Sequence, residues 1–339
     1  MIRITLTSLA VGLGGAAVAY VLNAPAAVLI GPALAVSGAA LSGLRVGIAE
    51  PVRNACFVVL GLGVGSGFTT DAGAAIQRWP FAFAAMAAML AVTMFLTRTI
   101  LARAFDFDRR SAILAAAPGH LSFVMGLSQD LGADTARIAV VQTLRVLALT
   151  VTVPYAALAL GYRMDPVVLP QTAPMSMSAL AVLAVLGIVL GLLFRRLLLP
   201  APLLLGPMAV SALAHVTGLT EGGVPGWLML PAFVTMGTLI GTRFTGMTLT
   251  QFRGALLAGL CMTLIAVTMA SLAAIPVAAA LDMPAPHVMV AFAPGGLETM
   301  IALGATMQAS PGFVAACHIV RLMILSVLIP VAVGRRRVG

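Results

Sequence analysis

Residues 291–330 read AFAPGGLETMIALGATMQASPGFVAACHIVRLMILSVLIP, and residues 115–154 read AAAPGHLSFVMGLSQDLGADTARIAVVQTLRVLALTVTVP. Each stretch is an apolar segment with a Pro-Gly pair, followed by a turn and a long apolar segment that contains one Arg. The offset between the two copies is 176 residues, as between Pro118 and Pro294 or between Arg145 and Arg321. Broken apolar segments at matching places in two halves of a chain are typical of secondary transporters and point to their binding site.

The composition of the chain is that of a membrane protein. Of its 339 residues, 61% are hydrophobic and 9% are charged, whereas soluble domains have about 25% charged residues. Apolar runs of about 20 residues, the length of a membrane-spanning helix, recur along the whole chain. We therefore expect an all-α, polytopic membrane protein whose first partner is the lipid bilayer.

The basic residues are all Arg, and the net charge is +9. In a soluble protein this charge would indicate a nucleic-acid partner. In an apolar chain, Arg at helix ends sets the orientation in the membrane, and no polar segment here is long enough for a DNA-binding domain. We expect no direct binding of nucleic acid. The apolar run 4–22 is expected to be a mature transmembrane helix and not a leader, because the second half has an equivalent run.

The two halves predict the same series of segments. In the first half the predicted spans are 4–22, 26–44, 54–70, 80–102 and 137–160, with a broken segment at 111–130. In the second half they are 178–196, 201–219, 227–245, 254–281 and 312–333, with a broken segment at 286–307. The predicted divisions are a first repeat at 1–160, a linker at 161–177, a second repeat at 178–333 and a basic cytoplasmic tail at 334–339.

The placement of Arg predicts how the halves are oriented. If each broken segment enters and leaves on one side of the membrane, each half crosses five times, and most Arg fall on the cytoplasmic side. If the broken segments cross fully, Arg195 and Arg196 move outside, against the usual bias. We therefore predict about ten transmembrane helices in two inverted repeats, in the bacterial inner membrane, with both termini cytoplasmic. Full crossing of the broken segments stays open as the alternative.

Polar residues inside the apolar segments predict where a solute binds. Pro and Gly free backbone groups that must be satisfied inside the protein, because lipid cannot satisfy them. A charged side chain at the membrane centre costs at least about 2.5–3.5 kcal/mol, so Arg145 and Arg321 need partners. Glu298 is the expected counter-charge of Arg321, whereas the first half has Ser122 at that place. The predicted solute-binding residues are Pro118, Gly119, His120, Gln142, Arg145, Pro294, Gly295, Gly296, Glu298, His318 and Arg321.

Two alternatives remain open for these residues. Each buried Arg could tie together only the carbonyl groups of a break and bind no ligand, and His120 could relay protons or be an ordinary core histidine. Metal binding and cofactors are not expected, because the four His are scattered and the three Cys are unpaired. Nucleotide motifs are also missing, so we expect transport to be passive or driven by an ion gradient.

The stretch APGGLETM at 293–300, with His318 and Arg321 downstream, resembles the AbrB-type family of bacterial membrane proteins over essentially the whole chain. The resemblance implies a duplicated transmembrane domain. Members are labelled as regulators of gene expression or, by an older name, as ammonia monooxygenases. The first half departs from the motif, with Gly119-His120 in place of Gly-Gly. Small soluble DNA-binding regulators share the family's name, but nothing here is similar to their β-rich fold.

Three classes of function follow from these observations. A secondary transporter or permease for a small solute, with or without a coupling ion, fits the broken segments and buried charges best. A membrane-embedded regulator of gene expression, acting through a partner or a solute, is the alternative that the family label implies. A monooxygenase is disfavoured, because copper and iron sites need clustered ligands, and we expect the protein not to be an enzyme. A homo-oligomer is left open.

Overall fold

The computed structural model describes residues 1–68, 79–118, 121–159 and 173–333, and this part of the chain is all-helical. The first half contains α1 (Ile2–Val21), α2 (Ala27–Leu41), α3 (Glu50–Gly65), α5 (Trp79–Ala104), α6 (Arg109–Ala116), α7 (Leu121–Asp130) and α8 (Thr135–Ala159). The second half contains α9 (Met177–Arg196), α10 (Pro202–Val216), α11 (Gly226–Thr242), α12 (Leu249–Leu281), α13 (Ala285–Phe292), α14 (Leu297–Thr306) and α15 (Pro311–Val333). The expected all-α fold is confirmed for these residues.

Most helices of matching place have similar lengths in the two halves, although α5 has 26 residues and α12 has 33. The helices α1 and α9 have 20 residues each, α2 and α10 have 15, α6 and α13 have 8, and α7 and α14 have 10. Each predicted broken segment is a pair of short helices. The helices α6 and α13 end before Ala117 and Ala293, whose backbones are extended, because a residue before Pro disfavours the helical conformation.

Six helices are long and apolar enough to cross a membrane: α1, α5, α8, α9, α12 and α15. They are the helices of a multi-pass membrane protein. The predicted spans at 26–44, 54–70, 201–219 and 227–245 form shorter helices, of 15 to 17 residues. At 1.5 Å per residue these extend about 22–26 Å, less than the roughly 30 Å of hydrocarbon in a typical bilayer. The count of ten crossings therefore stays a prediction.

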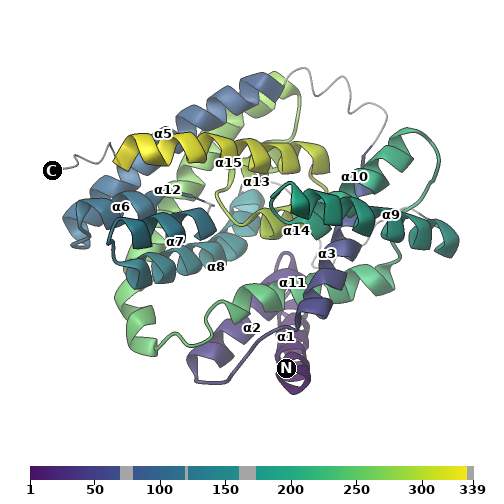
Figure 1. The fold of residues 1–339 in the computed structure, drawn as a ribbon, viewed down its shortest axis with the longest axis horizontal. Helices are drawn as coiled ribbons and strands as arrows, with labels where there is room; N and C mark the ends of the chain where they lie inside the picture. The colour runs from purple at the N-terminus through teal and green to yellow at the C-terminus, as the bar shows by residue number, and fades with distance from the viewer. Residues whose placement is uncertain (69–78, 119–120, 160–172, 334–339) are drawn as a thin grey trace.

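The helices form two bundles, and each bundle takes helices from both halves of the chain (Figure 1). One bundle contains α1, α2 and α3 with α9, α10 and α11. The other contains α5 to α8 with α12 to α15. The main contacts between the bundles are those of α8 and α14 with α2, α3 and α11. The two helices that carry most of the interface are thus the ones beside the two Pro-Gly breaks.

Close helix packing in the first bundle is matched between the halves. Gly61 of α3 lies against α10, where an added Cβ would be 3.1 Å from the Cβ of Pro207. Gly237 of α11 lies against α2, where an added Cβ would be 3.0 Å from the Cβ of Pro32. Small residues allow helices to approach closely, which favours their association in a membrane. Each half therefore contributes a glycine that receives the proline-bearing helix of the other half.

Candidate functional site

Arg321 on α15 holds the second break together. Its Nη1 donates to the carbonyl oxygen of Ala293 and its Nη2 to that of Gly295, both at 2.8 Å. The side chain is 1% exposed. The planar guanidinium presents two donors side by side, so one residue satisfies both carbonyl groups that the break leaves without helical partners.

Two residues of α8 share the same task at the first break. The Nε2 of Gln142 donates to the carbonyl oxygens of Leu114 (3.0 Å) and Ala117 (3.1 Å). Arg145 donates from Nη2 to Oε1 of Gln142 at 3.1 Å. Its Nη1 makes a longer hydrogen bond, of 3.4 Å, to the carbonyl oxygen of Ala117. Pro118 is buried, whereas Gly119 and His120 lie outside the described residues. Arg145 is therefore held mainly through Gln142 and less tightly by the break itself.

Arg321 and Glu298 do not form an ion pair in this structure, and their expected approach to a shared ligand stays a prediction. Arg321 instead donates to the carbonyl groups of Ala293 and Gly295. The alternative left open by the sequence, that a buried Arg ties a break together, thus describes the hydrogen bonds of Arg321. His318 is fully buried and bonds through Nδ1 to Val314 of its own helix.

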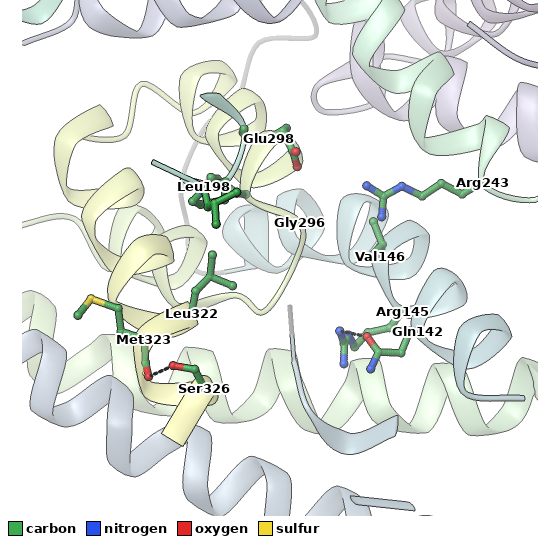
Figure 2. Close-up of a pocket in the computed structure, with 13 residues that line it drawn as sticks. Gln142, Arg145, Val146, Leu198, Arg243, Gly296, Glu298, Leu322, Met323 and Ser326 are labelled. Atoms are coloured by element: carbon green, nitrogen blue, oxygen red, sulfur yellow. Dashed lines mark hydrogen bonds between the residues drawn. The ribbon is translucent and has the colours of Figure 1, made fainter. Parts of the chain in front are cut away.

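A cavity of about 600 Å³ lies where the two bundles meet, next to the second break (Figure 2). One bundle contributes residues of α8, α15 and the start of α14. The other contributes the connection between α9 and α10 and the residue that ends α11. The lining residues are Gln142, Arg145, Val146, Leu198, Pro200, Ala201, Arg243, Gly296, Leu297, Glu298, Leu322, Met323 and Ser326.

Opposite charges face each other across this cavity without forming an ion pair. Arg243, from the end of α11, extends toward Gly296 from the far side of the cavity (Figure 2). Its Nη2 is 3.7 Å from the point where a Cβ on Gly296 would lie, and Oε2 of Glu298 is 3.7 Å from the same point. The cavity thus has charged groups of both signs at its boundary between the bundles.

The connection between α9 and α10 has a strained backbone where it lines the cavity. Leu198 has φ 58° and Ala201 has φ 43°, values that residues other than Gly rarely adopt. The matching connection between α1 and α2 has Asn23 at φ 51° and Ala26 at φ 48°. The strain therefore belongs to the turn in both halves. Leu198 is also 90% exposed, so the second copy presents an apolar side chain at the cavity.

The structure brings some of the predicted solute-binding residues to this cavity and buries others behind it. The predicted residues that line it are Gln142, Arg145, Gly296 and Glu298. Four other predicted residues are buried at or next to the second break and do not line the cavity: Pro294, Gly295, His318 and Arg321. Within the described ranges, no three His, Cys, Asp or Glu side chains are grouped so that they could hold a metal ion.

Arg243 is the main cavity residue that the sequence reasoning missed. A signal for it was present, because residues 241–245 repeat residues 65–69 and Arg243 stands where the first half has Gly67. A charged residue that breaks the repeat is the same kind of signal as Glu298 opposite Ser122. The residues of 198–201 and of α15 carry no such signal, because apolar positions facing a cavity look like any others in the sequence.

Six membrane-length helices, with buried Arg residues at two helix breaks, define an all-helical, multi-pass membrane protein. The family model described as "Transition state regulatory protein AbrB" matches residues 5–336, so the chain belongs to the AbrB family. It is 24% identical to "Uncharacterized protein YhjN" of Bacillus subtilis (strain 168), over 80% of this chain and 75% of that protein. It is 25% identical to "Putative regulator AbrB" of Escherichia coli (strain K12), over 65% of this chain and 64% of that protein. No solved structure gives a significant match.

Proposed function

We propose that the protein is a secondary transporter or permease for a small solute, with its binding site in the cavity between the two bundles. The observation that carries this proposal is the position of the cavity. Both bundles line it, it adjoins a helix break, and it contains charged groups from each side. A site at the boundary of two bundles can change its access when one bundle moves against the other, which is the arrangement of alternating access.

We propose further that the two halves are inverted repeats with about ten crossings in all. This arrangement is supported by the equal lengths of four helix pairs, by the reciprocal glycine contacts at Gly61 and Gly237, and by an Arg that donates to the residue before each Pro, Ala117 or Ala293. In this proposal the protein lies in the inner membrane, with both termini in the cytoplasm. Transport of the solute is either driven by the gradient of a coupling ion or passive. The protein is not an enzyme.

A regulator of gene expression is the second candidate function, and it is supported by the names of the family and of one relative. The family description and the name of the Escherichia coli relative both refer to regulation. A membrane-embedded chain of this kind would act through a partner protein or through the solute that it moves. In the second case the regulator and the transporter are the same protein, and the change in gene expression is a consequence of transport.

The proposal is tested in two stages. Metabolites are first compared between cells that lack the protein and cells that overproduce it, which identifies solutes whose distribution depends on it. The purified protein is then reconstituted into liposomes and the flux of these solutes is measured, with Arg243→Gln as the cavity variant and Arg253→Gln, on the exposed surface of α12, as the control. We expect flux in the wild type and the control and a loss of flux in the cavity variant. Equal flux through empty liposomes and all three proteins would contradict the proposal.

A further inference from the structure

Three polar groups of different chemistry surround one open point beside Gly296. A Cβ at this position would lie 3.5 Å from Oγ1 of Thr299 and 3.7 Å from both Nη2 of Arg243 and Oε2 of Glu298. These distances are ordinary van der Waals contacts, so a space about the size of a methyl group is free there. A hydroxyl, a guanidinium and a carboxylate therefore gather around the backbone of Gly296, which lines the cavity.

Thr299 of α14 and Arg145 of α8 each have a buried polar atom without a hydrogen-bond partner in the described part of the chain. Thr299 is fully buried and its Oγ1 has no partner. Arg145 is 2% exposed, lines the cavity, and has an Nε without a partner. Buried groups of this kind are uncommon in native structures, and an unseen water or ion is one explanation for them. A guanidinium can only donate, so its missing partner is an acceptor.

The electrostatic balance of the cavity favours an anion with a single charge. Arg145 and Arg243 bring two positive charges and Glu298 brings one negative charge. The cavity also includes the start of α14, where the N-cap residue Gly296 offers no side chain to satisfy the first peptide N–H groups. A helix N-terminus carries a partial positive charge and readily binds an anionic group. A second negative charge on the ligand would face Glu298.

We infer that the cavity takes a small organic acid with one carboxylate, and that the carboxylate lies beside Gly296 between Arg243 and the start of α14. The cavity volume of about 600 Å³ is much larger than a carboxylate needs. The apolar side chains of Val146, Leu297 and Leu322 in its wall fit the rest of such a molecule. This inference rests on the proposed function, since it gives the chemical class of the transported solute.

The sign of the preferred charge is tested by binding to the purified full chain in detergent. The probes are butyrate, butylammonium and succinate, added at constant ionic strength, and the midpoint of thermal unfolding is followed against probe concentration. We expect butyrate to raise the midpoint with a dissociation constant at least tenfold lower than those of the other two probes. A preference for butylammonium or succinate, or no stabilisation by any probe, would overturn the inference.

Gly296→Ala is the matched test of the position. Gly296 has φ −68° and ψ 144°, which Ala adopts freely, and its Cβ would meet only ordinary contacts. We expect the variant to unfold slightly below the wild-type temperature without ligand, because Ala is a poorer N-cap than Gly, and to bind butyrate at least tenfold more weakly. Arg243→Gln should weaken butyrate binding as much, while Arg253→Gln should bind like the wild type. Unchanged butyrate binding by Gly296→Ala would overturn the inference.

Binding and transport are separated by these measurements. Butyrate binding that depends on Gly296 and Arg243, without flux of any solute in liposomes, would contradict the proposed transport and leave the inference standing. Flux of a solute, with binding that prefers butylammonium, would contradict the inference and leave the proposed transport standing.

Discussion

The two helix breaks lie at matching places in the chain but are held in different ways. At the second break a single side chain, Arg321, donates two hydrogen bonds of 2.8 Å to the freed carbonyl groups. At the first break Gln142 makes two bonds and Arg145 adds only one long bond of 3.4 Å. Arg321 does not line the cavity, whereas both residues of the first break do.

Buried Arg residues at equivalent places can therefore have different roles. A guanidinium whose donors are engaged by backbone carbonyls cannot bind a solute without releasing the break. Arg145 is supported through Gln142 and lines the cavity, whereas Arg321 does not. We therefore expect Arg321 to act mainly on stability and Arg145 mainly on solute binding, and the following variants test this contrast.

Arg321→Ala should have the largest effect on stability. It removes two buried hydrogen bonds from a charged donor, each of which contributes about 1.5–3 kcal/mol, so the expected loss is about 3–6 kcal/mol. The measurement is the midpoint of thermal unfolding in detergent, together with the protein level in membranes. Arg321→Lys keeps the charge but loses the planar pair of donors and should recover only part of the loss. If Arg321→Ala were as stable as the wild type, the hydrogen bonds of Arg321 would not stabilise the second break.

Arg145→Ala should cost less in stability and more in activity. Gln142 still donates to both carbonyl groups of the first break, so only one long bond and the bond to Gln142 are lost. We expect a loss of about 1–3 kcal/mol, with solute flux reduced by at least tenfold per folded molecule. Flux in liposomes, normalised to folded protein, checks the prediction. A stability loss equal to that of Arg321→Ala would remove the contrast between the breaks.

Adjacent glycines of the second break should respond differently to Ala. At Gly295 an added Cβ would lie 2.8 Å from Cγ and 2.9 Å from Sδ of the buried Met300. Overpacking of this kind typically costs about 1–3 kcal/mol. At Gly296 the same change meets only ordinary contacts and costs only the N-cap preference for Gly over Ala, so the loss of stability should be smaller while binding is lost. Thermal unfolding of the two variants without ligand makes the comparison, and equal destabilisation would show that the point beside Gly296 is not free.

His318→Gln should have the smallest effect, because it gives the second half the residue of the first. The Nε2 of His318 has no hydrogen-bond partner in the described structure, and Nδ1 bonds only within its helix. A Gln at this place can donate to the break as Gln142 does. We expect a change in stability within about 1 kcal/mol. The reverse change, Gln142→His, removes two bonds to carbonyl groups and should cost more. Equal losses of stability in the two variants would contradict the claim that Gln142 supports its break and His318 does not.

The order of the helices and the places of the breaks could be predicted from the sequence, because both depend on local features. Apolar runs define the helices, and each Pro-Gly pair interrupts one wherever it occurs. Gln142 and Arg145 were also predictable as partners of a break, since a spacing of three residues places them on one helical face.

The sequence did not predict which helices form each bundle or the direction in which the Glu298 side chain points, because neither depends on local features. The two bundles mix helices from both halves, which depends on close packing between distant residues such as Gly61 and Pro207. Glu298 was expected to pair with Arg321, but a position in the sequence does not fix which side of α14 a carboxylate faces. Arg243 lies far from both breaks in the chain, and only the fold brings it to Gly296.

Alternating access predicts that the cavity can be reached from both sides of the membrane, and thiol labelling tests this directly. Ser326 lines the cavity and is exposed, so Ser326→Cys in a chain freed of Cys56, Cys261 and Cys317 offers one thiol there. A membrane-impermeant thiol reagent is applied to right-side-out and to inside-out vesicles, with Arg253→Cys as the control. We predict labelling of Ser326→Cys in both preparations and of Arg253→Cys in one. Labelling of Ser326→Cys in one preparation only would contradict alternating access.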